Sequence, residues 1–179
     1  KPPVRFPSRL GPFRTMNRLS IRTESENETL TLGHRLGELC QSGDVFLLSG
    51  ELGTGKTCLI RGIAHGLGVR EAPFSPSFVL VREYQGRLAL YHMDFYRMES
   101  TDEVADLGVQ DYLNADGVCA IEWAERARDL LPEECLSVTL SYLPPREESR
   151  GIVLEANGDR YTNLIDSLAG YPEAAHIWT

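Results

Sequence analysis

The fold is decided by the stretch Gly50-Glu51-Leu52-Gly53-Thr54-Gly55-Lys56-Thr57, which has the form G-x-x-x-x-G-K-[ST] of a phosphate-binding loop. The mostly apolar run 44–49 before it predicts a buried strand. Apolar residues at helical spacing over 58–67 predict a helix after it. A strand, a loop and a helix in this order are the context that the motif requires, so the stretch predicts a nucleotide-binding site.

The residue types of this loop suit the chemistry of holding phosphate. Glycines let backbone N–H groups approach an anion closely, and the N-terminus of the next helix directs a partial positive charge at the same place. Lys56 can reach the β- and γ-phosphates, and the hydroxyl of Thr57 can ligate Mg²⁺. The chain has one other lysine, Lys1, and otherwise uses arginine, so it keeps a compact point charge at the loop. The alternative is a glycine-rich turn that only resembles the motif.

Length and charge set the broad class of the protein. The chain has 179 residues, enough for one domain with a full core, and a formal net charge of −8. Residues 1–15 are rich in Pro and Arg without periodicity, so we expect a disordered extension or an interaction arm before a single domain over 16–179, with Met16 as the native start. An acidic body argues against a broad nucleic-acid-binding face, but it leaves open a partner that itself binds nucleic acid.

The cysteines and the apolar runs bear on location. The four cysteines form no C-x-x-C pair, which argues against a zinc site. Cys58 and Cys119 stand in apolar surroundings typical of small core residues. We find no secretory apolar segment, and the longest apolar runs are too short to span a bilayer. We therefore expect a cytoplasmic protein with free thiols and no membrane partner.

Periodicity and turn residues predict the remaining elements. A helix should open with the capping-box pattern Ser25-Glu26-Asn27-Glu28 and end at Gly43, and Gly66 and Gly68 should end the helix after the loop. The other elements expected are an edge strand over 19–22, strands over 78–84 and 88–94 joined by a turn at 85–87, a helical stretch over 99–113 broken near Gly108, a strand over 118–122, a short helix up to Leu131, strands over 136–143 and 152–156, and a last helix over 161–168. This alternation predicts an α/β fold with a mixed, mostly parallel central sheet and antiparallel hairpin additions.

Two acidic residues are candidates to complete a Mg-nucleotide site. Asp94 ends one predicted strand and Glu122 ends another. Carboxylates at the carboxyl ends of strands beside a phosphate loop hold the metal and orient water in such folds. A strand-end acid can equally face solvent or cap the next helix, and spacing alone leaves these alternatives open.

Other side chains near these acids are weighed in the same way. Trp123 can stack on a base or a partner, although a Trp at such a place is more often part of the core. His92 lies beside Asp94, and a lone His in a strand usually has a structural role. Arginines can supply charge to a transferring phosphoryl group, and the candidates are Arg82, Arg97 and Arg126.

Four segments together resemble the TsaE family, the bacterial ATPases needed to make threonylcarbamoyladenosine on transfer RNA. They are the phosphate loop, Ser75-Pro76-Ser77-Phe78, Tyr91-His92-Met93-Asp94-Phe95-Tyr96-Arg97 and Ile121-Glu122-Trp123, in the order and spacing of that family. The resemblance runs from about Met16 to the final helix. In the S-P-T segment of the family the third position is Ser77 here, and the hydroxyl is kept.

The resemblance implies a three-layer, P-loop NTPase-like ATPase that binds ATP or ADP with Mg²⁺. It implies that Thr57, Asp94 and Glu122 serve the metal, and that Lys56, Asp94 and Glu122 serve hydrolysis. The residues assigned to the nucleotide are Leu52, Gly53, Thr54, Gly55, Lys56, Thr57, Cys58, Ser75, Ser77 and Trp123. The implied partner is the TsaD–TsaB heterodimer, which the ATPase resets between turnovers, so that tRNA is involved only indirectly.

Three other functions remain as alternatives. A small-molecule kinase uses the same loop, but it needs an acceptor pocket and an Arg-rich lid. The segment after Glu122 offers Arg126 and Arg128 but is short for a lid. A GTPase switch needs N-K-x-D, and no Asn in this chain is followed by Lys. A nucleotide-sensing module would bind a partner without turnover.

Overall fold

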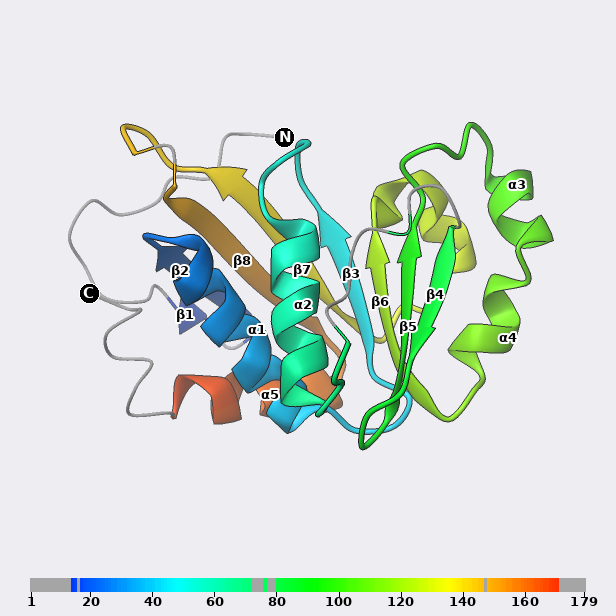
Figure 1. Ribbon diagram of the computed structural model, residues 1–179, viewed down its shortest axis with the longest axis horizontal. Coiled ribbons are helices and arrows are strands. Elements are labelled where there is room, and N and C mark those ends of the chain that lie inside the picture. The colour runs from blue at the N-terminus through cyan, green and yellow to red at the C-terminus, as the bar shows by residue number, and fades with distance from the viewer. Residues whose placement is uncertain (1–13, 16, 72–75, 77–79, 147, 171–179) are drawn as a thin grey trace.

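The computed structural model describes residues 14–15, 17–71, 76, 80–146 and 148–170, and its centre is an eight-stranded sheet (Figure 1). The sheet order is β1-β2-β8-β7-β3-β6-β5-β4. The bounds are β1 Arg14–Thr15, β2 Arg18–Thr23, β3 Val45–Ser49, β4 Val81–Tyr84, β5 Ala89–Asp94, β6 Gly117–Glu122, β7 Cys135–Tyr142 and β8 Arg150–Asn157. The four central strands β7, β3, β6 and β5 run parallel. Antiparallel strands are added on both sides, which confirms the predicted fold class.

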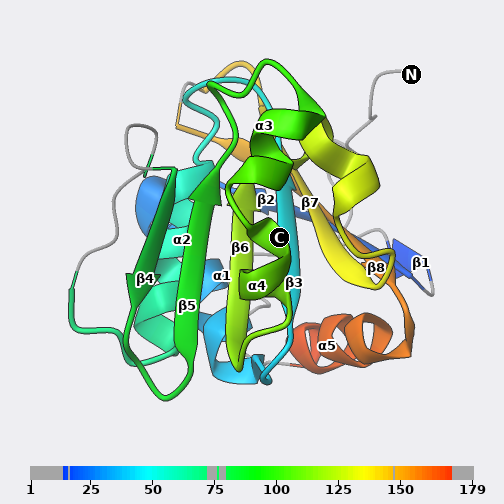
Figure 2. The same cartoon turned by 90° about the vertical axis from the view of Figure 1, so that its right-hand side faces the viewer.

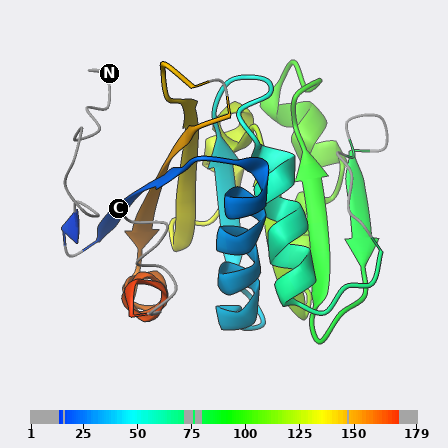
Figure 3. The ribbon, with the colours of Figure 1, turned by 60° about the vertical axis from the view of Figure 1, so that its left-hand side comes forward.

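Helices cover both faces of this sheet. On one face lie α1 (Glu26–Leu39), α2 (Lys56–Gly66) and α5 (Asp159–Ala169), which share a core with the sheet (Figure 3). On the other face lie α3 (Thr101–Asp106), α4 (Val109–Leu113) and the 3₁₀ helix η1 (Ala124–Leu130) (Figure 2). Side chains of β3 alternate between the two cores, with Phe46 and Leu48 in the first and Val45 and Leu47 in the second, as expected for a strand buried on both faces. Within the described part of the chain, no helix is both long and apolar enough to cross a bilayer.

Helix α1 starts where the sequence predicts. The hydroxyl of Ser25 accepts a hydrogen bond from the backbone N–H of Glu28 at 3.2 Å, and the carboxylate of Glu28 accepts one from the backbone N–H of Glu24 at 2.7 Å. These bonds satisfy N–H groups that have no partner within the helix. The predicted break at Gly108 is also confirmed, since this residue has a φ of 70° between α3 and α4.

Helices α1 and α2 pack against each other through glycines. A Cβ added at Gly33 would lie 2.3 Å from Leu59 O, and one at Gly37 would lie 2.2 Å from Ile63 O. The same holds from the other side, where a Cβ at Gly66 would lie 2.1 Å from His34 O. The backbones therefore approach more closely than any side chain would allow. Gly66 ends α2 as predicted, and it also belongs to this contact.

Some expectations need correction or fall outside the described residues. The strand expected at the sheet edge, β2, is second in the order, because the backbone of Arg14–Thr15 pairs along its outer side. The rest of the expected 1–15 extension lies outside the described residues, as do residues 78–79 of the strand expected over 78–84. The short helix before Leu131 is present as η1, with a non-helical Ala127 inside it.

Candidate nucleotide-binding site

The phosphate loop connects β3 to α2 at the carboxyl end of the parallel strands. Gly53 has a φ of 79° and Gly55, the residue that caps α2, has a φ of 100°, which L side chains rarely adopt. A Cβ at Gly53 would also lie 2.6 Å from the hydroxyl of Tyr142. The positive φ at both positions therefore favours glycine, and at Gly53 an added Cβ would also displace the Tyr142 hydroxyl.

Lys56 is held inside this loop. Its side chain is 4% exposed, and its ammonium donates hydrogen bonds to the carbonyl oxygens of Gly50 at 2.7 Å and Glu51 at 2.9 Å. The ammonium nitrogen lies 4.1 Å from the ring centroid of Trp123, a cation–π contact. Burial lowers the pKa of Lys56, and the negative charge of Glu122 opposes this shift. Lys56 is thus a buried cation whose hydrogen-bond partners are neutral carbonyl oxygens.

Glu122 is in contact with the loop. The hydroxyl of Thr57 donates a hydrogen bond to Oε1 of Glu122 at 2.7 Å, and Nε2 of His92 lies 2.9 Å from the same oxygen. Glu122 is 3% exposed and His92 is fully buried. Of the alternatives left open by the sequence, a solvent-facing Glu122 is therefore wrong.

Asp94 lies beside Glu122 on the neighbouring strand. The two residues are partners in the parallel register of β5 and β6, which places both at the same end of the sheet. Asp94 is 2% exposed, and its Oδ1 accepts a hydrogen bond from the backbone N–H of Tyr96 at 2.8 Å. It therefore fixes the turn after β5 and also borders the space in front of Thr57.

A cavity of about 350 Å³ collects most of the residues that the sequence singles out. It is lined by Leu52, Gly53, Gly55, Lys56, Thr57, Asp94, Tyr96, Glu122 and Trp123. Thr54 does not line this cavity, and its hydroxyl donates a hydrogen bond within the loop to Glu51 O at 2.8 Å. Ser75 and Ser77 are outside the described residues. Tyr96 is a lining residue that we did not assign, although it stands in the segment that carries the resemblance.

Trp123 lies at the border between the second core and this cavity. It is half-buried and has a left-handed backbone, with φ 57° and ψ 37°. Its ring centroid lies 5.0 Å from that of Tyr96, 4.1 Å from the ammonium of Lys56 and 5.9 Å from the guanidinium of Arg126. A large residue in this conformation is strained, and such strain is concentrated at functional sites.

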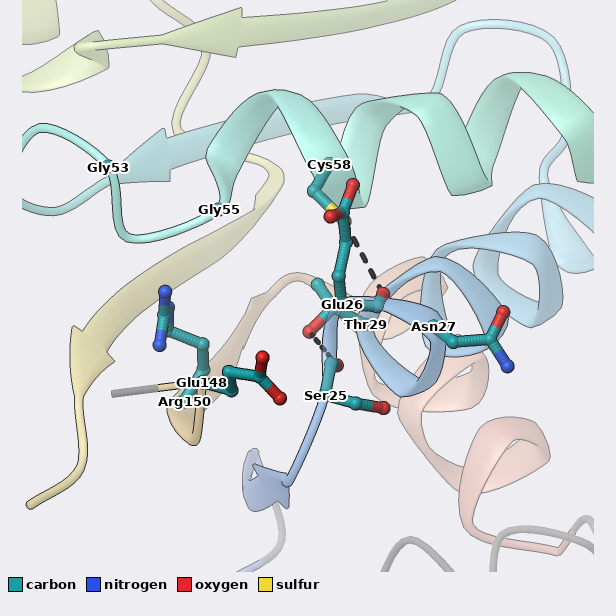
Figure 4. A pocket seen from close by; sticks show the side chains of 9 residues that line it. All are labelled: Ser25, Glu26, Asn27, Thr29, Gly53, Gly55, Cys58, Glu148 and Arg150. Atoms are coloured by element: carbon teal, nitrogen blue, oxygen red, sulfur yellow. Dashed lines mark hydrogen bonds between the residues drawn. The ribbon is translucent and has the colours of Figure 1, made fainter. Parts of the chain in front are cut away.

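A second hollow of about 430 Å³ adjoins the other side of the loop (Figure 4). It lies between the N-terminus of α1, the first turn of α2 and the start of β8, and it shares Gly53 and Gly55 with the first cavity. The other lining residues are Ser25, Glu26, Asn27, Thr29, Cys58, Glu148 and Arg150. Cys58 faces this hollow rather than the core, and its thiol donates to Glu26 O at 3.5 Å. Burial raises the pKa of this thiol to about 11.

Two residues on the β7–β8 pair support the loop from this side, and sequence reasoning missed both. Tyr142 donates a hydrogen bond from its hydroxyl to Leu52 O at 2.8 Å, and Arg150 donates from Nε to Thr54 O at 3.1 Å. The guanidinium of Arg150 also lies 4.7 Å from the ring centroid of Tyr142. Both residues are about 90 positions from the loop in sequence, so no local pattern could have indicated them.

A known protein family matches most of the chain, including the residues of this site. Residues 23–151 match the family described as "Threonylcarbamoyl adenosine biosynthesis protein TsaE". The chain belongs to the TsaE family. The matched region contains every residue of the first cavity as well as Tyr142 and Arg150, so both sides of the loop lie within the TsaE match.

Two curated TsaE relatives and one solved structure illustrate the similarity. The protein named "tRNA threonylcarbamoyladenosine biosynthesis protein TsaE" in Bacillus subtilis is 39% identical over 155 residues, covering 86% of this chain and 96% of the relative. The protein of the same name in Treponema pallidum is 43% identical over 121 residues, covering 68% of this chain and 90% of the relative. The crystal structure of Bacillus subtilis YdiB superimposes with a TM-score of 0.73 at 36% identity, covering 85% of this chain and 94% of that one.

Proposed function

We propose that this TsaE-family chain binds ATP and ADP with Mg²⁺ and hydrolyses ATP to drive the modification of tRNA with threonylcarbamoyladenosine. The names of the relatives supply the pathway. The observation that carries the proposed chemistry is the arrangement around the loop, where buried Lys56 lies next to the hydrogen-bonded pair of Thr57 and Glu122.

The two hollows suggest how the nucleotide would lie. Phosphates would occupy the first cavity, against the loop and the N-terminus of α2, where backbone N–H groups and a helix dipole favour anions. Lys56 could turn to a phosphate by exchanging carbonyl partners, without first breaking an ion pair. The nucleoside would extend past Cys58 into the second hollow, which is large enough for a base and a ribose.

Magnesium suits the donors at this site. Thr57 and Glu122 present oxygen atoms that are already 2.7 Å apart, and Asp94 is the register partner of Glu122. Hard oxygen ligands of this kind are those that Mg²⁺ prefers, so Thr57, Asp94 and Glu122 are the residues that would hold it. The bound ion would neutralise negative charge on the β- and γ-phosphates. Glu122 and Asp94 would in addition orient the attacking water and accept its proton.

The partner is proposed to be the TsaD–TsaB heterodimer, with hydrolysis resetting that complex. Among the described residues, the large hydrophobic side chains that are exposed are Leu52, Tyr96 and Tyr142, and all three surround the phosphate loop. A protein bound there would be sensitive to the occupant of the loop. The net charge of −8 agrees with an indirect relation to tRNA.

The proposal is tested by phosphate release from ATP with Mg²⁺ or with EDTA, for the chain alone and with TsaD–TsaB. We expect slow hydrolysis that requires the metal and rises with the partner, and none from Lys56→Ala. A pull-down of TsaD–TsaB with and without ATP tests the association. Phosphoryl transfer to a nucleoside or sugar faster than to water would instead indicate a kinase, and partner binding without turnover would indicate a sensing module.

A further inference from the structure

His92 is an unusual residue for the interior of a sheet that is covered on both faces. It lies in β5 between apolar neighbours, it is fully buried, and its register partner on β6 is Ala120. Within the described part of the chain, its Nδ1 atom is buried without a hydrogen-bond partner. A buried polar atom that is left unpaired costs about 1–3 kcal/mol. An apolar side chain at this position would avoid that cost, so the imidazole has a role that an apolar residue could not fill.

The other ring nitrogen shows where that role lies. Nε2 is 2.9 Å from Oε1 of Glu122, and the same oxygen accepts the hydroxyl hydrogen of Thr57 at 2.7 Å. A nitrogen this close to a carboxylate oxygen stabilises it only by donating a hydrogen, so we assign a ring hydrogen to Nε2. Oε1 of Glu122 is therefore held by two donors from two elements, β5 and α2.

This double contact fixes a carboxylate that has an alternative partner close by. The negative charge of Glu122 attracts the ammonium of Lys56. A glutamate has three rotatable side-chain bonds, so a single hydrogen bond from Thr57 would leave its carboxylate free to swing toward that cation. The second donor, from a ring packed rigidly inside the sheet, holds the carboxylate toward Thr57 and leaves Lys56 for phosphate.

We propose that His92 is a positioning residue for the hydrolysis step, and that it acts by donating a hydrogen bond from Nε2 to Glu122. The inference rests on the proposed ATPase function and adds a residue to it. Residues that orient a metal ligand or a catalytic carboxylate in this way typically contribute 10- to 100-fold to activity. The effect should fall on the rate of the chemical step, because His92 does not line the space proposed for the nucleotide.

Three substitutions separate positioning from packing. In His92→Gln the amide nitrogen reaches about as far as Nε2, in His92→Asn it reaches only about as far as Nδ1, and in His92→Leu there is no donor. We expect single-turnover hydrolysis of radiolabelled ATP, with protein in excess, to fall about 10- to 100-fold in the Leu and Asn variants and less than about fivefold in the Gln variant. ADP affinity without metal, measured by calorimetry, should change less than about threefold in all three.

A double-mutant cycle gives a second readout that packing would not produce. If His92 acts through Glu122, then His92→Leu added to Glu122→Gln should lower the rate no further than Glu122→Gln alone. Additive losses, or equal rates in the Gln, Asn and Leu variants, would overturn the inference. Thermal unfolding identifies any variant that fails to fold, and the Gln-to-Asn comparison then decides. Absence of hydrolysis by the unmodified chain would instead overturn the proposed function itself.

Discussion

Gly37→Ala tests whether the α1–α2 contact depends on the absence of side chains. The added Cβ would lie 2.2 Å from Ile63 O and 2.9 Å from Gly66 Cα, whereas ordinary contact begins at 3.4 Å. The obstacle is backbone, so the two helices must separate by roughly 1 Å or more. Overpacking of this kind costs about 1–3 kcal/mol, and Gly→Ala in a helix interior returns about 0.5–1 kcal/mol. Since the obstacle is backbone, we take the upper part of the first range, about 2–3 kcal/mol, and the net expectation is a destabilisation of about 1–2.5 kcal/mol.

The measurement is thermal and urea unfolding of the variant beside a control in the same helix. For a domain of this size, the expected loss lowers the unfolding midpoint by roughly 2–10 °C. Thr31→Ala is the control, because Thr31 is exposed on α1 and alanine raises helix propensity by a few tenths of a kcal/mol. Its midpoint should stay constant or rise slightly. A Gly37→Ala protein as stable as the Thr31→Ala protein would refute the argument from close approach.

Three further outcomes follow from the site and its surroundings. Lys56→Met removes a buried charge with a lowered pKa, so the thermal unfolding midpoint without ligand should stay constant or rise. In the same thermal-shift assay the stabilisation by ADP should be lost, and a large fall of the midpoint without ligand would contradict the reasoning. Cys58, with a pKa of about 11, should be about 0.1% thiolate at pH 8. The rate of its alkylation, measured by peptide mapping, should rise about tenfold per pH unit below pH 11, and a rate that levels off near pH 8.5 would contradict the raised pKa. Arg160→Leu leaves buried Asp44 without its bidentate partner, whose two nitrogens lie 2.9 and 2.5 Å from the carboxylate oxygens. The free energy of unfolding, measured in urea, should fall by about 2–3 kcal/mol. A fall below about 0.5 kcal/mol would show that solvent screens the pair.

The features that the sequence predicts well are those fixed by neighbouring residues. The loop, its strand and its helix depend on glycines and apolar residues within about 25 positions, and the start of α1 depends on Ser25 and Glu28. Asp94 and Glu122 could be paired as candidates because the carboxyl ends of parallel strands meet at one edge. Their contacts were not predictable, since Glu122 has its bond to Thr57 while Asp94 also holds the turn at Tyr96.

The features that the sequence could not predict depend on distant packing. The position of β2 inside the sheet follows from a backbone pairing with Arg14–Thr15, which carry no strand periodicity. Trp123 belongs to the cavity because its backbone is left-handed, and side-chain type gives no sign of that conformation. The role of His92 depends on one oxygen of Glu122, which becomes visible only once β5 and β6 are placed side by side.

The bonds from Tyr142 and Arg150 to the phosphate loop give strands β7 and β8 a mechanical connection to the site. Those strands add nothing to the cavity in front of Thr57, yet a shift of the β7–β8 pair would move Leu52 and Thr54 directly. The turn between Tyr142 and Arg150 is therefore a suitable place to insert a domain that controls the loop. A sensor domain grafted into it would transmit its own opening and closing to the loop.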